Sequence, residues 1–186
     1  MGKYNSIETF ASFATTGRVV VFDTETTGCT SSDEICQLAA AEYVNGQLER
    51  TMNVYIHPSC EMNPFAEQIH GISMDYLDEH GIEPSDALRQ FFDFLGSDVL
   101  LVAHNNRFDM RMLQQECAKF DVAFEPEGVQ LCDTLALSRW LRPDLKSHAL
   151  GNLLEPLGIE GINSHDALDD TLACAGVFFK LVADAT

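Results

Sequence analysis

A continuous apolar run, Arg18–Asp23 (RVVVFD), most constrains how this chain can fold. Its β-branched and aromatic residues favour a strand, and the lack of alternating polar residues indicates that both faces of the strand are buried. Such a strand lies inside a sheet that helices cover on both sides. The run ends in Asp23, and a second acid, Glu25, follows two residues later.

The pattern that follows predicts the rest of the sheet. A second strand is expected at Ile35–Val44, and Asn45-Gly46 gives a hairpin turn into a third strand, Gln47–Ile56. The remaining expected elements are helices from Pro64 to Leu95 with breaks at Gly71 and Gly81, a strand at Asp98–Ala103, a helix at Asn106–Phe120, a strand at Val129–Cys132, and helices at Thr134–Leu141, His148–Leu157 and Ala167–Ala183. A hairpin followed by alternating strands and helices predicts an α/β fold, a mixed sheet flanked by helices.

Length and composition fit one domain spanning residues 1–186. A hydrophobic fraction of 46% is enough for a core, which excludes intrinsic disorder. The formal net charge of −18 argues against a protein that coats nucleic acid through a broad basic face. This net charge is compatible with an enzyme that binds one end of a nucleic-acid strand in a cleft that contains metal ions.

The cellular setting expected from the sequence is the cytoplasm, with no membrane contact. The six cysteines are scattered without a C-x-x-C pair, and the polar start MGKYNSIETF carries no signal peptide, so the thiols are expected to be reduced. No apolar run approaches the ~20 residues of a membrane span.

Asp23 and Glu25 are the first candidate functional residues. Side chains two apart on a strand point the same way, so these carboxylates project together from the strand end, where α/β sheets place ligands. Two adjacent carboxylates repel each other and are costly to bury without a cation. A D-x-E pair is equally compatible with two solvated loop acids, so this motif alone leaves both interpretations open.

Two later segments carry further candidates. Asp109 lies in the first turns of the helix after the Asp98–Ala103 strand, where an acid also simply suits a helix N-terminus. His165 precedes the last helix, and Asp170 follows five residues later. Asp166 or Ser164 is a candidate N-cap of that helix.

The order of these motifs resembles the DnaQ-like, DEDDh-type 3′–5′ exonucleases, and within them the proofreading epsilon branch of bacterial DNA polymerase III. The matching segments are VVFDTETTG (Val20–Gly28), IHGIS (Ile69–Ser73), AHNNRFDMRML (Ala103–Leu113), CDT (Cys132–Thr134) and HDALDD (His165–Asp170), from about residue 18 to 181. The resemblance implies a ribonuclease H-like fold. It also implies metal carboxylates at Asp23, Glu25, Asp109 and Asp170, with His165 as general base.

Four carboxylates suit two divalent cations, Mg²⁺ or Mn²⁺. Two such cations lie roughly 3.5–4 Å from each other and bind the attacking and leaving oxygens of a phosphodiester. Histidine can take the proton of the attacking water near neutral pH.

The resemblance also implies substrate contacts at Thr26, His70 and Asn105. One departure stands out: the family often carries an acid five residues before the histidine of the HG motif, and here that place holds Phe65. The stretch Arg139–Lys146 either contacts phosphates along a bound nucleic-acid strand or is ordinary charge on a helix surface. Trp140, the single tryptophan, is expected in the core.

The leading function is therefore a metal-dependent 3′–5′ exonuclease that releases mononucleotides from single-stranded DNA ends. The alternatives are a related RNA-trimming exoribonuclease and an interaction subunit that binds a polymerase. The chain ends at Thr186 directly after the last helix, with no clamp-binding pattern, which favours a free-standing nuclease or a trimmed catalytic domain.

Overall fold

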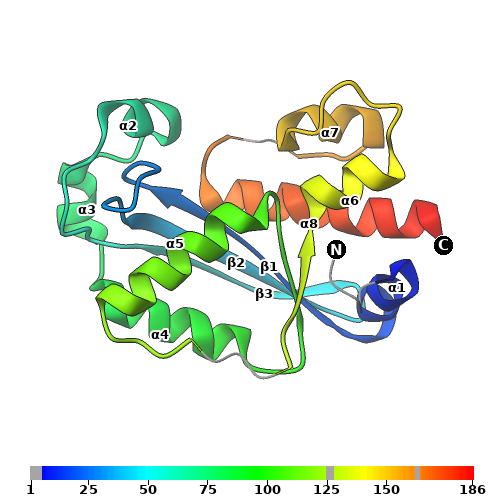
Figure 1. Ribbon diagram of the computed structural model, residues 1–186, viewed down its shortest axis with the longest axis horizontal. Helices are drawn as coiled ribbons and strands as arrows, with labels where there is room; N and C mark the ends of the chain where they lie inside the picture. Colours follow the sequence, from blue (N-terminus) through cyan, green and yellow to red (C-terminus); the bar gives the residue numbers. More distant parts are fainter. Residues whose placement is uncertain (1–5, 125–127, 162–163) are drawn as a thin grey trace.

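The computed structural model describes residues 6–124, 128–161 and 164–186, and its centre is a mixed five-stranded sheet of order β3-β2-β1-β4-β5 (Figure 1). The strands are β1 (Arg18–Thr26), β2 (Ile35–Val44), β3 (Gln47–Tyr55), β4 (Leu100–Ala103) and β5 (Gln130–Asp133). β1 pairs antiparallel with β2 and parallel with β4, so the hairpin half and the parallel half of the sheet meet at β1.

Helices cover both faces of this sheet. They are α1 (Ile7–Thr16), α2 (Pro64–His70), α3 (Met74–His80), α4 (Pro84–Leu95), α5 (Asn106–Lys119), α6 (Thr134–Leu141), α7 (Leu150–Leu157) and α8 (Ala167–Ala185). One core lies between the sheet and α1, α6, α7 and α8, and the other between the sheet and α4 and α5 (Figure 1). The expected α/β mixed sheet flanked by helices is confirmed. None of the described helices is long and apolar enough to cross a membrane.

β1 is buried on both faces, as its apolar run predicts. Val19 and Val21 belong to the core under α8, whereas Val20 and Phe22 belong to the core under α4 and α5. This alternation continues past the apolar part, because the strand extends to Thr26. The acidic pair therefore lies within the ordered strand, three residues further than the expected end at Asp23.

Other expected boundaries hold within a few residues, and the deviations have local causes. The turn residues Asn45 and Gly46 have φ of 52° and 78°, the left-handed conformations that a tight hairpin requires. β4 begins at Leu100 rather than Asp98, because Asp98 has a φ of 53° and cannot continue a strand.

Trp140 was expected in the core, and this prediction is wrong: its exposed fraction is 48%. The buried residues of α6 are Thr134, Leu137 and Ser138, which follow helical spacing along one face. Trp140 lies off that stripe and faces solvent.

Candidate active site

Asp23 and Glu25 lie near the carboxyl end of β1, on the face that α8 covers. The alternation of β1 places them with Val19 and Val21, whose side chains pack against α8. Glu25 pairs in register with Gln37 on β2. The two carboxylates therefore point toward the start of α8, which carries the HDALDD segment (His165–Asp170).

Asp109 comes from the opposite side of the sheet, in the first turn of α5. It is buried at 3% exposure, and the Thr24 hydroxyl donates to its Oδ1 at 2.7 Å. Thr24 lies between the two acids on β1, so its side chain points to the other face. Sequence analysis missed this residue, although alternation within D-T-E was the signal that could have found it.

His165 and Asp170 complete the group from the segment before α8 and its first turns. Single ligand atoms of Glu25, His165 and Asp170 all lie within 4.8 Å of one another. The Ser164 backbone N–H donates to Asp170 Oδ1 at 3.1 Å, which fixes this carboxylate. His165 is exposed and has a φ of 58°, so it stands in a sharp bend rather than in the helix.

Asp166 caps α8 and does not join this group of three. Its Oδ1 accepts from the backbone N–H groups of Leu168 and Asp169 at 3.0 and 3.2 Å. This is the N-cap role that the sequence offered for Asp166 or Ser164.

Burial and mutual repulsion dominate the electrostatics of these carboxylates. Burial, followed by the charges of Asp109 and Glu25, raises the pKa of Asp23 well above its usual range. Burial, followed by the charge of Asp170, raises the pKa of Glu25 to about 8. Burial raises the pKa of Asp109 to about 7, although the Thr24 hydroxyl opposes the shift. The charges that act on Asp23 and Glu25 are all carboxylates, and this oxygen-rich donor set fits divalent cations.

Gln37 is a second residue that sequence analysis missed. Its side chain is fully buried, and its amide Nε2 donates to Asp166 Oδ2 at 2.9 Å and to Asn53 Oδ1 at 3.0 Å. Its Oε1 accepts from the Ala167 backbone N–H at 3.1 Å. Gln37 thus ties β2 to the segment that carries His165.

A cavity of about 240 Å³ opens beside Glu25. One wall comes from the end of β1 and the loop after it, and the other from α2. The wall residues include Glu25, Thr26, Gly28 and Cys29 on the first side, and Phe65, Ile69 and His70 on the second. Phe65 is 76% exposed and Ile69 is 58% exposed, so the α2 wall presents two apolar side chains.

Two of the three expected substrate contacts, Thr26 and His70, line this cavity. His70 is held by both ring nitrogens: Nδ1 accepts from the Ile72 backbone N–H at 3.0 Å, and Nε2 lies 3.3 Å from the Thr26 carbonyl. Thr26 donates its hydroxyl to the Gly28 carbonyl at 2.6 Å. Both residues therefore also shape the wall.

Asn105 is not among the residues that line this cavity. It is the exposed residue before α5, with a φ of 66°, and its backbone N–H donates to Asp133 Oδ1 at 2.9 Å. Its side chain makes no cap hydrogen bond. Its role as a substrate contact stays a prediction.

Comparison with known proteins gives a family and several relatives. The exonuclease family model (RNase_T) matches residues 20–178. The chain is 35% identical over 164 residues to the PolC-type DNA polymerase III of Oceanobacillus iheyensis, and 34% identical over 167 residues to that of Bacillus subtilis. These matches cover 88% and 89% of this chain but only 11% of the length of each polymerase.

Solved structures share the fold. The zinc-bound complex of Escherichia coli exonuclease I with single-stranded DNA has a TM-score of 0.78 at 22% identity, covering 92% of this chain and 41% of that chain. Exonuclease X in complex with 5′ overhanging duplex DNA has a TM-score of 0.71 at 22% identity, covering 90% of this chain and 92% of that one. The expected ribonuclease H-like fold is confirmed by these neighbours. Because the family model matches most of its length, this chain belongs to the DnaQ-like exonuclease family.

Proposed function

We propose that this chain is one exonuclease domain, residues 1–186, which removes mononucleotides from the 3′ end of single-stranded DNA with the help of two divalent cations. The observation that carries the proposal is the position of Glu25, His165 and Asp170 within 4.8 Å of one another, beside an open cavity. A reactive group of this kind at the edge of a cavity suits a chain end that enters from solvent.

The acids are the residues that would hold the cations, Mg²⁺ or Mn²⁺. They are Asp23, Glu25, Asp109 and Asp170. When bound, the two cations supply electrostatic stabilisation for the charge that develops on the phosphodiester oxygens. The acids approach from both faces of the sheet, with Asp109 fixed by Thr24 and Asp170 fixed by the Ser164 N–H. This fixation preorganises the donor oxygens, so little reorganisation remains when a substrate arrives.

His165 is proposed to accept the proton of the attacking water. Its ring lies close to Glu25 and Asp170, where that water would stand, and it is exposed, so the proton can pass on to solvent. The left-handed bend at His165 keeps the ring outside α8.

The cavity is proposed to receive the terminal nucleotide. Phe65 and Ile69 offer apolar contact to a base of any identity, because every base has a π-face. Thr26 and His70 are proposed to contact the terminal sugar and base. Asn105, at the exposed start of α5, is proposed to contact the strand backbone rather than the cavity-bound nucleotide.

The relatives favour DNA over RNA as the substrate. PolC-type chains are DNA polymerases, and the matched exonuclease I structure contains single-stranded DNA. The same relatives support a polymerase subunit as a partner. All six cysteines are free thiols, which supports a reducing, cytoplasmic setting.

Degradation of 5′-labelled single-stranded DNA tests the proposed function directly. With Mg²⁺ or Mn²⁺ we expect a ladder that shortens one nucleotide at a time from the 3′ end, and no ladder with EDTA. An RNA oligonucleotide of the same length and base sequence should be degraded more slowly than the DNA. Nicking of circular DNA, or equally fast loss of a 3′-phosphorylated strand, would contradict the exonuclease assignment. Faster loss of RNA would favour the exoribonuclease alternative.

A second prediction concerns Gln37. In Gln37→Leu, the Ala167 N–H and the Asp166 carboxylate lose buried partners, which should destabilise the protein by about 1–3 kcal/mol. The kcat should fall about tenfold, because His165 is displaced from its working position. Thermal unfolding and single-turnover kinetics measure the two effects. Asn53→Ala is the matched control, since it removes only the other partner of Gln37. A wild-type kcat in folded Gln37→Leu would rule out the positioning role.

A further inference from the structure

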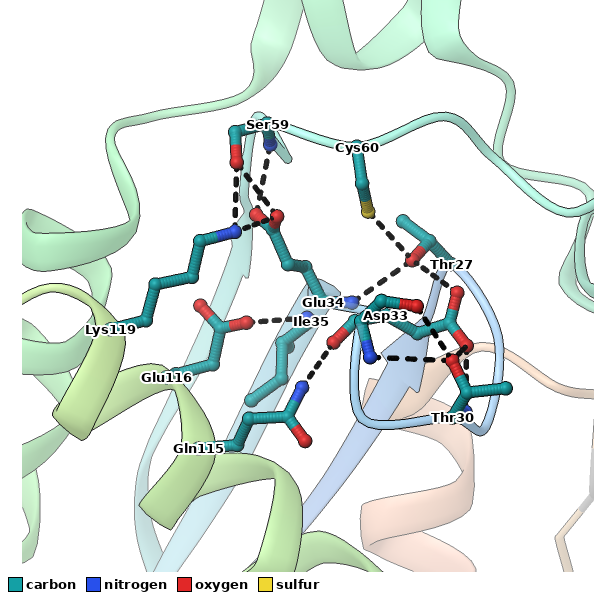
Figure 2. A network of polar contacts seen from close by, with 11 residues as sticks. Thr27, Thr30, Asp33, Glu34, Ile35, Ser59, Cys60, Gln115, Glu116 and Lys119 are labelled. Atoms are coloured by element: carbon teal, nitrogen blue, oxygen red, sulfur yellow. Dashed lines mark hydrogen bonds and ion pairs between the residues drawn. The ribbon is translucent and has the colours of Figure 1, made fainter.

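Glu34 is a buried carboxylate that the proposed chemistry does not use. It immediately precedes β2, and its side chain is only 1% exposed. Figure 2 shows it enclosed by the loop after β3 and by the end of α5. A buried charge is costly unless it is paired, so its partners define what it holds together.

The partners of Glu34 come from two other segments. Ser59 donates its backbone N–H to Oε2 and its hydroxyl to Oε1, both at 2.8 Å. Lys119, at the end of α5, forms an ion pair with Oε1 and donates to the Ser59 hydroxyl at 2.9 Å (Figure 2). Burial raises the pKa of Glu34, but the hydrogen bonds from Lys119 and Ser59 outweigh it, so the pKa is lowered and the carboxylate stays ionised.

Part of the first cavity wall comes from a loop that is hydrogen-bonded to the main chain of Glu34. The Thr27 N–H donates to the Glu34 carbonyl at 2.8 Å, and the Glu34 N–H donates to the Thr27 hydroxyl at 3.0 Å. These two bonds fix both ends of the residue 27–34 loop, which carries the wall residues Gly28 and Cys29. The position of Glu34 therefore sets the position of this wall.

The second wall is connected to the same carboxylate through Ser59. Four residues after Ser59, Asn63 caps α2 by accepting from the Phe65 N–H at 2.9 Å. The Asn63 N–H also donates to the Thr27 carbonyl at 2.9 Å, and Cys60 Sγ lies 3.2 Å from the Thr27 hydroxyl (Figure 2). α2 carries the apolar wall. The main chain of Glu34 thus holds the first wall through Thr27, and its buried carboxylate, paired with the half-exposed Lys119, holds Ser59 ahead of the second wall.

We infer that Glu34, Ser59 and Lys119 form a positioning clamp that sets the width of the cavity and thereby how tightly the terminal nucleotide binds. The inference rests on the proposed function, since it assigns the cavity to that nucleotide. None of the three residues lines the cavity or belongs to the acidic cluster. The clamp therefore acts on substrate binding and not on the chemical step.

Glu34→Gln tests the clamp, because it keeps the shape of the side chain and removes its charge. We expect the KM for a single-stranded DNA oligonucleotide to rise about tenfold, with kcat within about twofold of wild type. Hydrolysis of methyl p-nitrophenyl phosphate, a phosphodiester without a base, should be unchanged, since it makes no use of the walls. Lys119→Met should raise the KM in the same way, and Lys119→Arg should keep it near the wild-type value because it keeps the ion pair.

Glu42→Gln is the matched control. Glu42 is a buried acid on β2, the strand that Glu34 precedes, and it pairs with Arg18 and Arg50 at the end of the sheet away from the cavity. Glu42→Gln should lower the melting temperature about as much as Glu34→Gln does, but it should leave the KM unchanged. If Glu34→Gln does not fold, Lys119→Met carries the same measurement.

Two results would overturn the clamp. One is an unchanged KM in Glu34→Gln or, if that variant does not fold, in Lys119→Met. The other is a rise in KM for Glu42→Gln as large as that for Glu34→Gln. A wild-type protein that hydrolyses methyl p-nitrophenyl phosphate but no DNA would overturn the proposed function instead.

Discussion

Asp23→Asn should lower the rate of oligonucleotide degradation by about 10³–10⁴, the effect of losing several kcal/mol of metal-assisted stabilisation. Burial, followed by the charges of Asp109, Glu25 and Asp170, raises the pKa of Asp23. Asp23 therefore sits at the centre of the negative charge that would hold the cations. Single-turnover kinetics measure the loss of rate, and calorimetry with Mn²⁺ measures the loss of binding.

The same variant should stabilise the metal-free protein. A carboxyl group whose pKa is raised in the folded state keeps its proton while the unfolded chain loses it, so the free energy of unfolding falls as pH rises. For Glu25, this loss runs from its ordinary pKa up to about 8. Burial is the largest cause of the raised pKa of Asp23, and Asp23→Asn removes the resulting penalty because an amide has no proton to lose. In EDTA near pH 8, the melting temperature of Asp23→Asn should exceed that of wild type by at least about 2–4 °C.

The difference in melting temperature should vanish near pH 4 and reverse with Mn²⁺, which stabilises only a protein that binds it. Asp93→Asn is the matched control, because Asp93 is an exposed acid on α4. It should leave rate, Mn²⁺ binding and melting temperature unchanged. Unaltered Mn²⁺ binding in Asp23→Asn would show that the ligands are wrongly assigned.

Much of the fold follows from local pattern, because burial on both faces leaves a characteristic apolar run. The run RVVVFD located β1, and Asn45-Gly46 located the hairpin. The end of β1 was missed because Asp23–Thr26 carry no apolar signal and are held in the strand by pairing with β2. Trp140 was misplaced because size and hydrophobicity alone do not say which face of α6 it occupies.

The candidate site was accessible from the sequence for a different reason. Its acids lie at the end of β1, in the first turn of α5 and at the start of α8, and each position is marked by a motif in the chain. What the sequence could not supply are contacts that depend on three-dimensional packing. Gln37 and Asp166 are distant in sequence, as are Glu34 and Lys119, and no local pattern links them. Thr24 is the exception, since strand alternation alone points it at the opposite face.

His165→Ala should reduce the rate by about 10²–10⁴ while the Mn²⁺ affinity is retained, because a general base contributes to proton transfer and not to metal binding. Asp170→Asn should lose both activity and one bound metal ion, because Asp170 is a buried carboxylate whose Oδ1 is held by the Ser164 backbone N–H. Calorimetry with Mn²⁺ and single-turnover kinetics on the same preparations separate the two roles.

The backbone at His165 requires a second variant, because its φ of 58° disfavours alanine. Asn tolerates the left-handed region, so His165→Asn removes the base while keeping the bend, and it should be as slow as His165→Ala. Asp169→Asn is the control in the same segment: Asp169 accepts from the Ser164 hydroxyl at 2.8 Å and is not part of the group of three, so activity should persist. A loss of Mn²⁺ in both His165 variants would make this histidine a metal ligand instead of the base. Near-wild-type cleavage by both would remove it from the mechanism, because a ring so close to Glu25 and Asp170 would then serve neither proton transfer nor metal binding.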